Sequence, residues 1–201
     1  MGLRGRPLGV PMKMTKFGYF SEFLLFPPLI LAATLYAFHH SISPRPITWL
    51  ALFAAGLFAW TLLEYVLHRV LFHHAPILSG IHEQHHDEPQ ELIGTPAWAS
   101  ALVGLIAVAT PSWGLLGFDL GTASTTGLVV GYLWYVFIHY AVHHWQPPRD
   151  SYLYRARLRH ARHHFQSHSG NFGVTTGLWD HIFGSALTTN VGTATAVSHP
   201  K

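Results

Sequence analysis

Four long apolar segments constrain the fold of this chain more than any other feature. They cover residues 20–38, 47–67, 98–118 and 124–142. Each is about 20 residues long, which is the length a helix needs to cross a hydrocarbon core of about 30 Å. A single segment crosses lipid as a helix because a helix satisfies its own backbone hydrogen bonds. Since 49% of the residues are hydrophobic and only 10% are charged, we predict an all-α integral membrane protein with four transmembrane helices.

The basic residues predict the orientation of these helices, because Lys and Arg are enriched on the cytoplasmic side of membrane proteins. If the four segments cross in turn, the basic N-terminal stretch, Arg69 and the arginines of residues 149–162 share one side, and Arg45 lies on the other. We therefore expect a multi-pass protein of the bacterial inner membrane or the endoplasmic reticulum, with both termini cytoplasmic. The first segment exceeds the apolar length of a usual signal peptide, so we expect a retained anchor.

Three regions follow from this topology. Residues 1–19 are expected to form a basic cytosolic N-terminus, residues 20–185 the membrane domain, and residues 186–201 a small, polar, disordered tail.

Histidine is unusually frequent in this chain, with 17 residues against 12 Lys and Arg. Four clusters follow the second and fourth apolar segments, in the sequences HRVLFHH, HEQHH, HYAVHH and HARHH. The topology places all four clusters at the cytoplasmic face. Imidazole is the commonest metal ligand in proteins, and the chain contains no cysteine, so a metal site must use nitrogen and oxygen. We predict ten metal ligands: His68, His73, His82, His85, His86, His139, His143, His160, His163 and His164.

The spacing within the clusters suits helices whose ligands face inward. Residues i, i+3 and i+4 project from one face of a helix, so the triplets of HEQHH and HARHH can each point three nitrogen atoms toward a common centre. His68 and His73 are five residues apart, and we expect the α-helix to loosen near Phe72 if both are to face inward. Ten imidazoles exceed the ligands of one zinc site, so two metals with about five nitrogen atoms each fit the number of ligands.

Other polar residues are candidates for holding the ligands in place. Glu64 lies within an apolar segment four residues before His68, where a charged group is costly and usually functional. We expect it to accept a hydrogen bond from a ligand histidine, and Asp180 and His181 are further candidates for such a role. No catalytic side chain beyond the metal centre and no residue for an organic cofactor is predicted. The remaining histidines, which are not expected to be ligands, are His39, His40, His74, His144, His168 and His199.

Composition and motif position also bear on other functions. The high isoelectric point reflects a scarcity of acidic residues, and a nucleic-acid-binding face is not expected. A membrane metal transporter would place its ligands along the mid-bilayer path, whereas these clusters lie at the ends of apolar segments. A scaffold protein would leave the ten spaced histidines unexplained. Imidazole ligands suit iron, zinc, copper and nickel, so the residues alone leave the metal open.

The clusters belong to a longer pattern. HRVLFH, HEQHH, HYAVH and HARHH are followed by NFGVT at residues 171–175 and WDHIFG at residues 179–184. This order resembles the fatty acid hydroxylase/sterol desaturase superfamily over about residues 62–185, and membrane fatty acid 2-hydroxylases are the nearest likeness. Sterol or carotenoid hydroxylases and desaturases of the same superfamily are the alternatives.

The resemblance implies a di-iron centre held by the ten cluster histidines in a cytosolic helical cap. Such a centre inserts oxygen from O2 into a C–H bond of a membrane lipid, and zinc can replace iron in a purified sample. Family members take electrons from NAD(P)H through cytochrome b5 or a ferredoxin-type partner. Only about 19 residues precede the first apolar segment, so we expect an external donor in place of a fused cytochrome b5 domain. The connection between the first two clusters is short, so the lid over the substrate is expected to differ.

Overall fold

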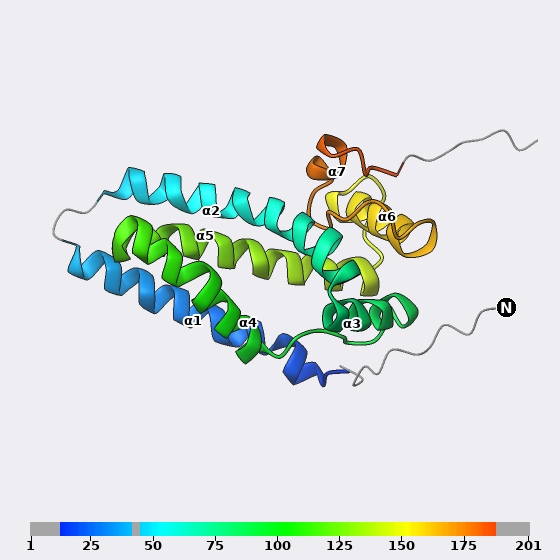
Figure 1. The fold of residues 1–201 in the computed structure, drawn as a ribbon, viewed down its shortest axis with the longest axis horizontal. Helices are drawn as coiled ribbons and strands as arrows, with labels where there is room; N and C mark the ends of the chain where they lie inside the picture. The colour runs from blue at the N-terminus through cyan, green and yellow to red at the C-terminus, as the bar shows by residue number, and fades with distance from the viewer. Residues whose placement is uncertain (1–12, 42–44, 188–201) are drawn as a thin grey trace, which may run out of the picture.

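The computed structural model describes residues 13–41 and 45–187. Most of the expected basic N-terminus and disordered tail, including His199, therefore lies outside the described residues. The helices follow one another as α1 (Lys16–His40), α2 (Pro46–Val66), the π-helix η1 (Leu67–Phe72), α3 (Pro76–Asp87), α4 (Ala97–Gly104), the π-helix η2 (Leu105–Ala109), α5 (Thr110–His144), α6 (Tyr152–Phe165) and α7 (Leu178–Ile182) (Figure 1). Apart from an isolated bridge between Lys13 and Ile93, the described residues contain no β structure, which confirms the all-α class.

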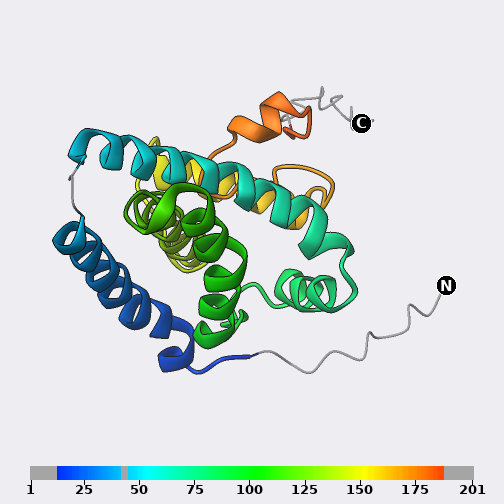
Figure 2. The same ribbon diagram turned by 60° about the vertical axis from the view of Figure 1, so that its left-hand side comes forward.

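Three helical stretches of the described chain are long and apolar enough to cross a membrane: Lys16–His40, Pro46–Phe72 and Ala97–His144. The last joins the predicted segments 98–118 and 124–142, and Gly117 interrupts it with φ 76° and ψ 166°. Essentially only glycine adopts that backbone conformation. Figures 1 and 2 show α4 and the first part of α5 running away from the end that carries α3, and the rest of α5 running back to that end, so the chain reverses near Gly117. The Trp113 indole joins the two limbs by donating to Thr122 Oγ1 over 3.2 Å.

Glycines allow α2 and α5 to pack closely along the bundle. A Cβ atom on Gly56 would overlap the Ser124 carbonyl, and one on Gly127 would overlap the Phe53 carbonyl. Small residues at such crossings are typical of membrane helices because they let the backbones approach. This contact fixes how far apart the ends of α2 and α5 lie, and those ends carry two of the histidine clusters.

A helical cap formed by α3, α6 and α7 gathers at one end of the long helices (Figure 1). Its apolar core consists of Ile138 and Val142 from α5, Ala156 from α6 and Val174 from the loop before α7. Ser151 begins α6 by accepting a hydrogen bond from the Tyr154 backbone N–H over 3.1 Å, as an N-cap residue does. The cap therefore packs directly on the end of α5 and holds α6 beside it.

Candidate metal centre

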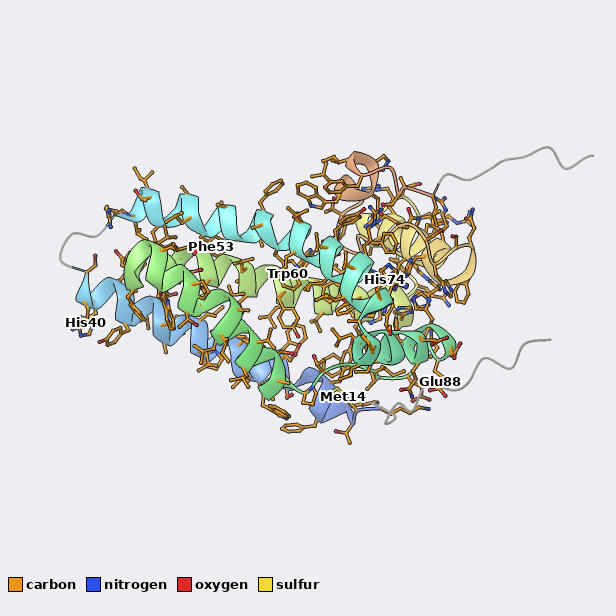
Figure 3. All side chains as sticks on the ribbon, viewed as in Figure 1. Met14, His40, Phe53, Trp60, His74 and Glu88 are labelled. Atoms are coloured by element: carbon orange, nitrogen blue, oxygen red, sulfur yellow. The ribbon has the colours of Figure 1, made fainter. Side chains whose placement is uncertain are left out.

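The predicted ligands converge at the cap end of the molecule. Figure 3 shows nitrogen atoms gathered there, near His74, whereas His40 lies at the opposite end. Nine of the ten histidines form two groups in which the ligand nitrogen atoms lie within 4.8 Å of one another. The first group contains His68, His73, His82, His86 and His163, and the second contains His85, His139, His143 and His160.

The tenth histidine, His164, borders the second group. Its Nε2 lies 3.1 Å from Nε2 of His160, and its ring centroid lies 4.8 Å from that of His143. The other face of the His164 ring stacks on His86 of the first group, with centroids 4.1 Å apart. The structure therefore arranges the ten residues as two adjacent sets of about five.

The helices α3 and α6 each divide their histidine triplet between the two groups. In α3, His82 and His86 join the first group and His85 joins the second; in α6, His160 belongs to the second group, His164 borders it, and His163 joins the first. The expectation that each triplet faces one common centre was wrong. Residues i and i+4 differ by about 40° around a helix, whereas i+3 and i+4 differ by about 100°. The triplet therefore faces two sides, and the two helices contribute in opposite proportions.

The π-helix η1 brings His68 and His73 to the same side. Its hydrogen bonds close five residues apart instead of four, and the two rings lie nearly parallel with centroids 5.4 Å apart. Single π-helical turns inside α-helices occur frequently at functional sites. The predicted loosening of the helix near Phe72 is confirmed, since η1 ends at that residue.

Four Nε2 atoms of the first group form a closed ring of short contacts. The contacts are His68–His82 at 3.0 Å, His82–His86 at 3.0 Å, His86–His163 at 3.1 Å and His163–His68 at 3.1 Å. Nε2 of the fifth residue, His73, lies 3.3 Å from that of His163. Two nitrogen ligands at adjacent positions around a metal, each about 2.1 Å from it, lie about 3 Å apart, which matches these contacts. The residues therefore fit one metal ion with five nitrogen ligands and an open position.

The positions of the protons on two of these rings indicate that a cation binds between their Nε2 atoms. His68 Nδ1 donates to the Phe172 carbonyl over 2.6 Å, and His163 Nδ1 donates to the Gly170 carbonyl over 2.8 Å. A neutral imidazole carries one proton, so both Nε2 atoms present lone pairs. These lone pairs face each other across 3.1 Å, which is unfavourable unless a positive ion binds both.

Burial keeps the cap histidines neutral, as metal binding requires. Desolvation, followed by repulsion between neighbouring imidazoles, lowers the pKa of His85 and His86 to about 2. Burial and nearby histidines likewise lower the pKa of His73 and His163 to about 4. The pKa of His82 is depressed well below its usual range for the same reasons.

Several buried nitrogen atoms of the second group lack hydrogen-bond partners among the described residues. They are both ring nitrogen atoms of His85 and Nδ1 of His160, with Nδ1 of the bordering His164. A buried polar atom without a partner is rare in folded proteins. Nε2 of His143 also lies 2.9 Å from Nε2 of His160, so a second metal ion fits these nitrogen donors.

The residues expected to support the ligands have different partners from those predicted. Glu64 accepts hydrogen bonds from Val174 and Thr175, not from a histidine. Asp180 likewise accepts from the backbone of Phe172 and Gly173. Both carboxylates therefore bind the loop before α7 and are linked to the ligands through it.

Three histidines outside the ligand set have structural positions. His181 is exposed, and its Nδ1 lies 2.7 Å from the Gly177 carbonyl, so the expectation that it supports a ligand was wrong. Nε2 of His168 lies 3.0 Å from the His164 carbonyl. His144 stacks on Tyr140 with centroids 4.2 Å apart.

Sequence reasoning missed two contributors, the carbonyl oxygen atoms of Gly170 and Phe172. A backbone carbonyl has no residue signature of its own. The NFGVT segment pointed to this region as part of the family pattern, but the sequence did not indicate what the segment does.

A cavity of about 150 Å³ opens beside the histidines, between α1, α3 and α5. His82, His85 and His139 are among the residues that line it, and Leu78, Ile81 and Val136 contribute apolar walls. Its polar feature is Glu22 of α1, which is 4% exposed and accepts a hydrogen bond from the Tyr132 hydroxyl over 2.5 Å. An apolar group bound in this cavity would lie next to both metal sites.

Known proteins are similar to this chain in sequence and in fold. Fatty acid 2-hydroxylase of Homo sapiens is 34% identical over 144 residues, which cover 66% of this chain and 38% of that protein. Dihydroceramide fatty acyl 2-hydroxylase FAH2 of Arabidopsis thaliana is 33% identical over 147 residues, covering 66% of this chain and 59% of its own length. The chain thus spans about two to three fifths of the length of these relatives.

A solved structure has the same fold. It is full-length scs7p with only the hydroxylase domain visible, and it matches with a TM-score of 0.73 and 26% identity, covering 88% of this chain and 68% of that chain. The model of the fatty acid hydroxylase family matches residues 53–185, which include all four histidine clusters and the loop that anchors His68 and His163. With the resemblance confirmed over this region, the chain belongs to the fatty acid hydroxylase family.

Proposed function

We propose that this chain hydroxylates a fatty acyl chain of a membrane lipid, using O2 and two iron ions held by the ten histidines. The observation that carries the proposal is the closed ring of first-group nitrogen atoms, in which His68 and His163 already commit their protons to backbone carbonyls. The relatives named fatty acid and fatty acyl 2-hydroxylases favour carbon 2 of the acyl chain as the position of attack.

The chain's own residues position the reactants. When bound, the two iron ions would supply O2 activation, with one oxygen atom entering a C–H bond and the other leaving as water at the expense of two external electrons and two protons. The apolar wall of the cavity binds the acyl chain and excludes water. Glu22 and Tyr132 supply the polar groups of that cavity, and they orient the lipid by its polar end.

The topology that fits this function has four crossings, with the reversal at Gly117 separating the last two. Arg69 and the arginines of α6 lie at the cap end, which we assign to the cytoplasmic side. An external donor such as cytochrome b5 or a ferredoxin-type protein would supply electrons from NAD(P)H at this face. The bacterial inner membrane and the endoplasmic reticulum both fit this orientation.

Lipid analysis under isotopically labelled O2 tests the proposal. Cells expressing the protein should contain acyl chains with a labelled hydroxyl group on carbon 2, and cells expressing His163→Ala should not. His181→Ala is the matched control, because His181 is exposed and apart from both groups, and it should retain the product. A double bond in place of a hydroxyl group, or a label on another carbon, would contradict the proposed reaction.

Metal analysis gives an independent test. Protein from iron-supplemented cells should hold two metal ions per chain, and fewer than two would contradict the di-metal proposal. Zinc in the purified sample would leave the native metal undecided, because sites with nitrogen ligands accept it readily.

A further inference from the structure

The loop before α7, here residues 170–175, lies against the first histidine group and is held by two buried carboxylates. Glu64 comes from α2 and is 3% exposed, and Asp180 comes from α7 and is 0% exposed. A buried carboxylate is costly unless it is fully hydrogen-bonded. In the part of the chain that the structure describes, neither side chain hydrogen-bonds to a predicted ligand, so their burial calls for another explanation.

Glu64 holds the end of this loop with three hydrogen bonds. Its Oε1 accepts from the backbone N–H groups of Val174 over 2.6 Å and Thr175 over 2.8 Å. Its Oε2 accepts from the Thr175 hydroxyl over 2.6 Å. The carboxylate therefore ties the loop to the membrane helix that continues into η1 and His68.

Asp180 holds the middle of the loop in the same way. Its Oδ1 accepts from the Phe172 N–H and from the Ser185 hydroxyl, and its Oδ2 accepts from the Gly173 N–H, each over 2.8 Å. Arg159 donates to the carbonyls of Gly173 and Val174 over 2.8 and 2.6 Å. The backbone of this loop is thus held through both its N–H groups, which donate to the two carboxylates, and its carbonyl groups, which accept from Arg159.

This fixed backbone supplies the carbonyls that orient two ligands of the first group. Phe172 donates its N–H to Asp180, and its carbonyl accepts a hydrogen bond from His68. Gly170, two residues earlier, accepts from His163. Such a bond fixes the tautomer and the ring orientation of a metal-binding histidine.

The second group has less support of this kind. Among the described residues, His85 has no hydrogen-bond partner on either ring nitrogen atom, and His160 and His164 have none on Nδ1, whereas in the first group only Nδ1 of His86 is buried without a partner. Packing therefore does more than hydrogen bonding to position their rings in the metal-free chain. The two groups therefore differ in how far the protein orders them before a metal binds.

We propose that Glu64 and Asp180 act as positioning residues that hold the loop against His68 and His163, and that they make the first group the tighter of two unequal metal sites. This inference rests on the proposed function, because it requires two bound metals. Hydrogen-bond partners behind metal ligands typically change metal affinity by about 10- to 100-fold, which sets the expected size of the effect.

Iron release to a chromogenic ferrous chelator tests the proposal on the full chain in detergent. The wild-type protein should release one iron quickly, from the second group, and one slowly, from the first. His85→Ala should remove the fast phase and keep the slow one. Asp180→Asn places an amide N–H against a backbone N–H donor, so it should accelerate the slow phase by about 10- to 100-fold and leave the fast phase unchanged.

Glu64→Gln separates the hydrogen-bond role from a merely structural need for a charge. The amide oxygen atom can still accept from Val174 and Thr175, and the amide N–H can donate to the Thr175 hydroxyl, which then turns to accept. Glu64→Gln should therefore keep the slow phase, whereas Glu64→Leu should lose it. If Glu64→Leu fails to fold, Thr175→Val removes one bond and should give a smaller acceleration. Asp119→Asn, at the opposite end of the bundle, where Asp119 bonds Ser41, should change neither phase.

Distinct results overturn the two proposals. A wild-type protein that releases two irons in a single phase contradicts the inequality of the sites. An unchanged slow phase in both Asp180→Asn and Glu64→Leu contradicts the positioning role. Failure of the wild-type protein to bind two metals at all instead counts against the proposed function.

Discussion

Replacing His85 by Leu should stabilise the metal-free protein while damaging the metal centre. His85 is 6% exposed, and both of its ring nitrogen atoms are buried without partners among the described residues. In the proposed metal-loaded protein one of these atoms would be a ligand. Without metal, the ring keeps an unpaired donor and an unpaired acceptor inside the cap.

The size of the effect follows from these two atoms. An unpaired buried polar group costs about 1–3 kcal/mol, so the two together cost about 2–6 kcal/mol in the metal-free state. Leu is similar in size, and fitting it into the site costs up to about 1.5 kcal/mol. We therefore expect His85→Leu to raise the free energy of unfolding of the metal-free protein by about 1–4 kcal/mol.

The assay is thermal unfolding in detergent, followed by tryptophan fluorescence, with and without metal. Each kcal/mol moves the midpoint by about 2–4 °C for a domain of this size. Metal should raise the midpoint of the wild-type protein more than that of His85→Leu, because a ligand that binds only the folded state stabilises it. The order of the two proteins should therefore reverse when metal is added.

His163→Leu is the matched control. His163 has a partner in the metal-free protein, the Gly170 carbonyl, and its removal leaves that carbonyl unpaired. His163→Leu should therefore lower the metal-free midpoint. If His85→Leu lowers it equally, the argument from unpaired nitrogen atoms is wrong.

Two further predictions follow from the same structure. The pKa values of His73 and His163 are lowered to about 4 in the folded metal-free protein, below the ordinary value of about 6.5, so the unfolded chain binds protons first as the pH falls. The stability of the metal-free protein should therefore be full above about pH 6.5 and decrease as the pH drops toward 4. An unfolding midpoint that does not change with pH over this window would contradict the prediction. Gly117→Ala should lower the unfolding midpoint, because φ 76° with ψ 166° costs a residue with a side chain about 1–3 kcal/mol. Gly114→Ala is the control and should not lower it, because Gly114 lies in open space and does not have a positive φ. Equal effects of the two substitutions would show that the reversal tolerates a side chain.

The sequence alone determined the all-helical class of the fold and identified the histidines that the structure brings together. Both rest on short-range information. Apolar segments of about 20 residues imply membrane helices, and the spacing of histidines around a helix is fixed by its period. Even the departure from a regular α-helix near Phe72 could be predicted, since His68 and His73 could not share a side of an ideal α-helix.

The tertiary structure decided how those ligands are used. The division of HEQHH and HARHH between two groups depends on where α3 and α6 lie relative to each other, which no local spacing encodes. The partner of Glu64 proved to be a loop about 110 residues away in sequence, because buried backbone N–H groups require acceptors. The carbonyls of Gly170 and Phe172 belong to the backbone, which is chemically the same at every residue, so only the folded chain could select them.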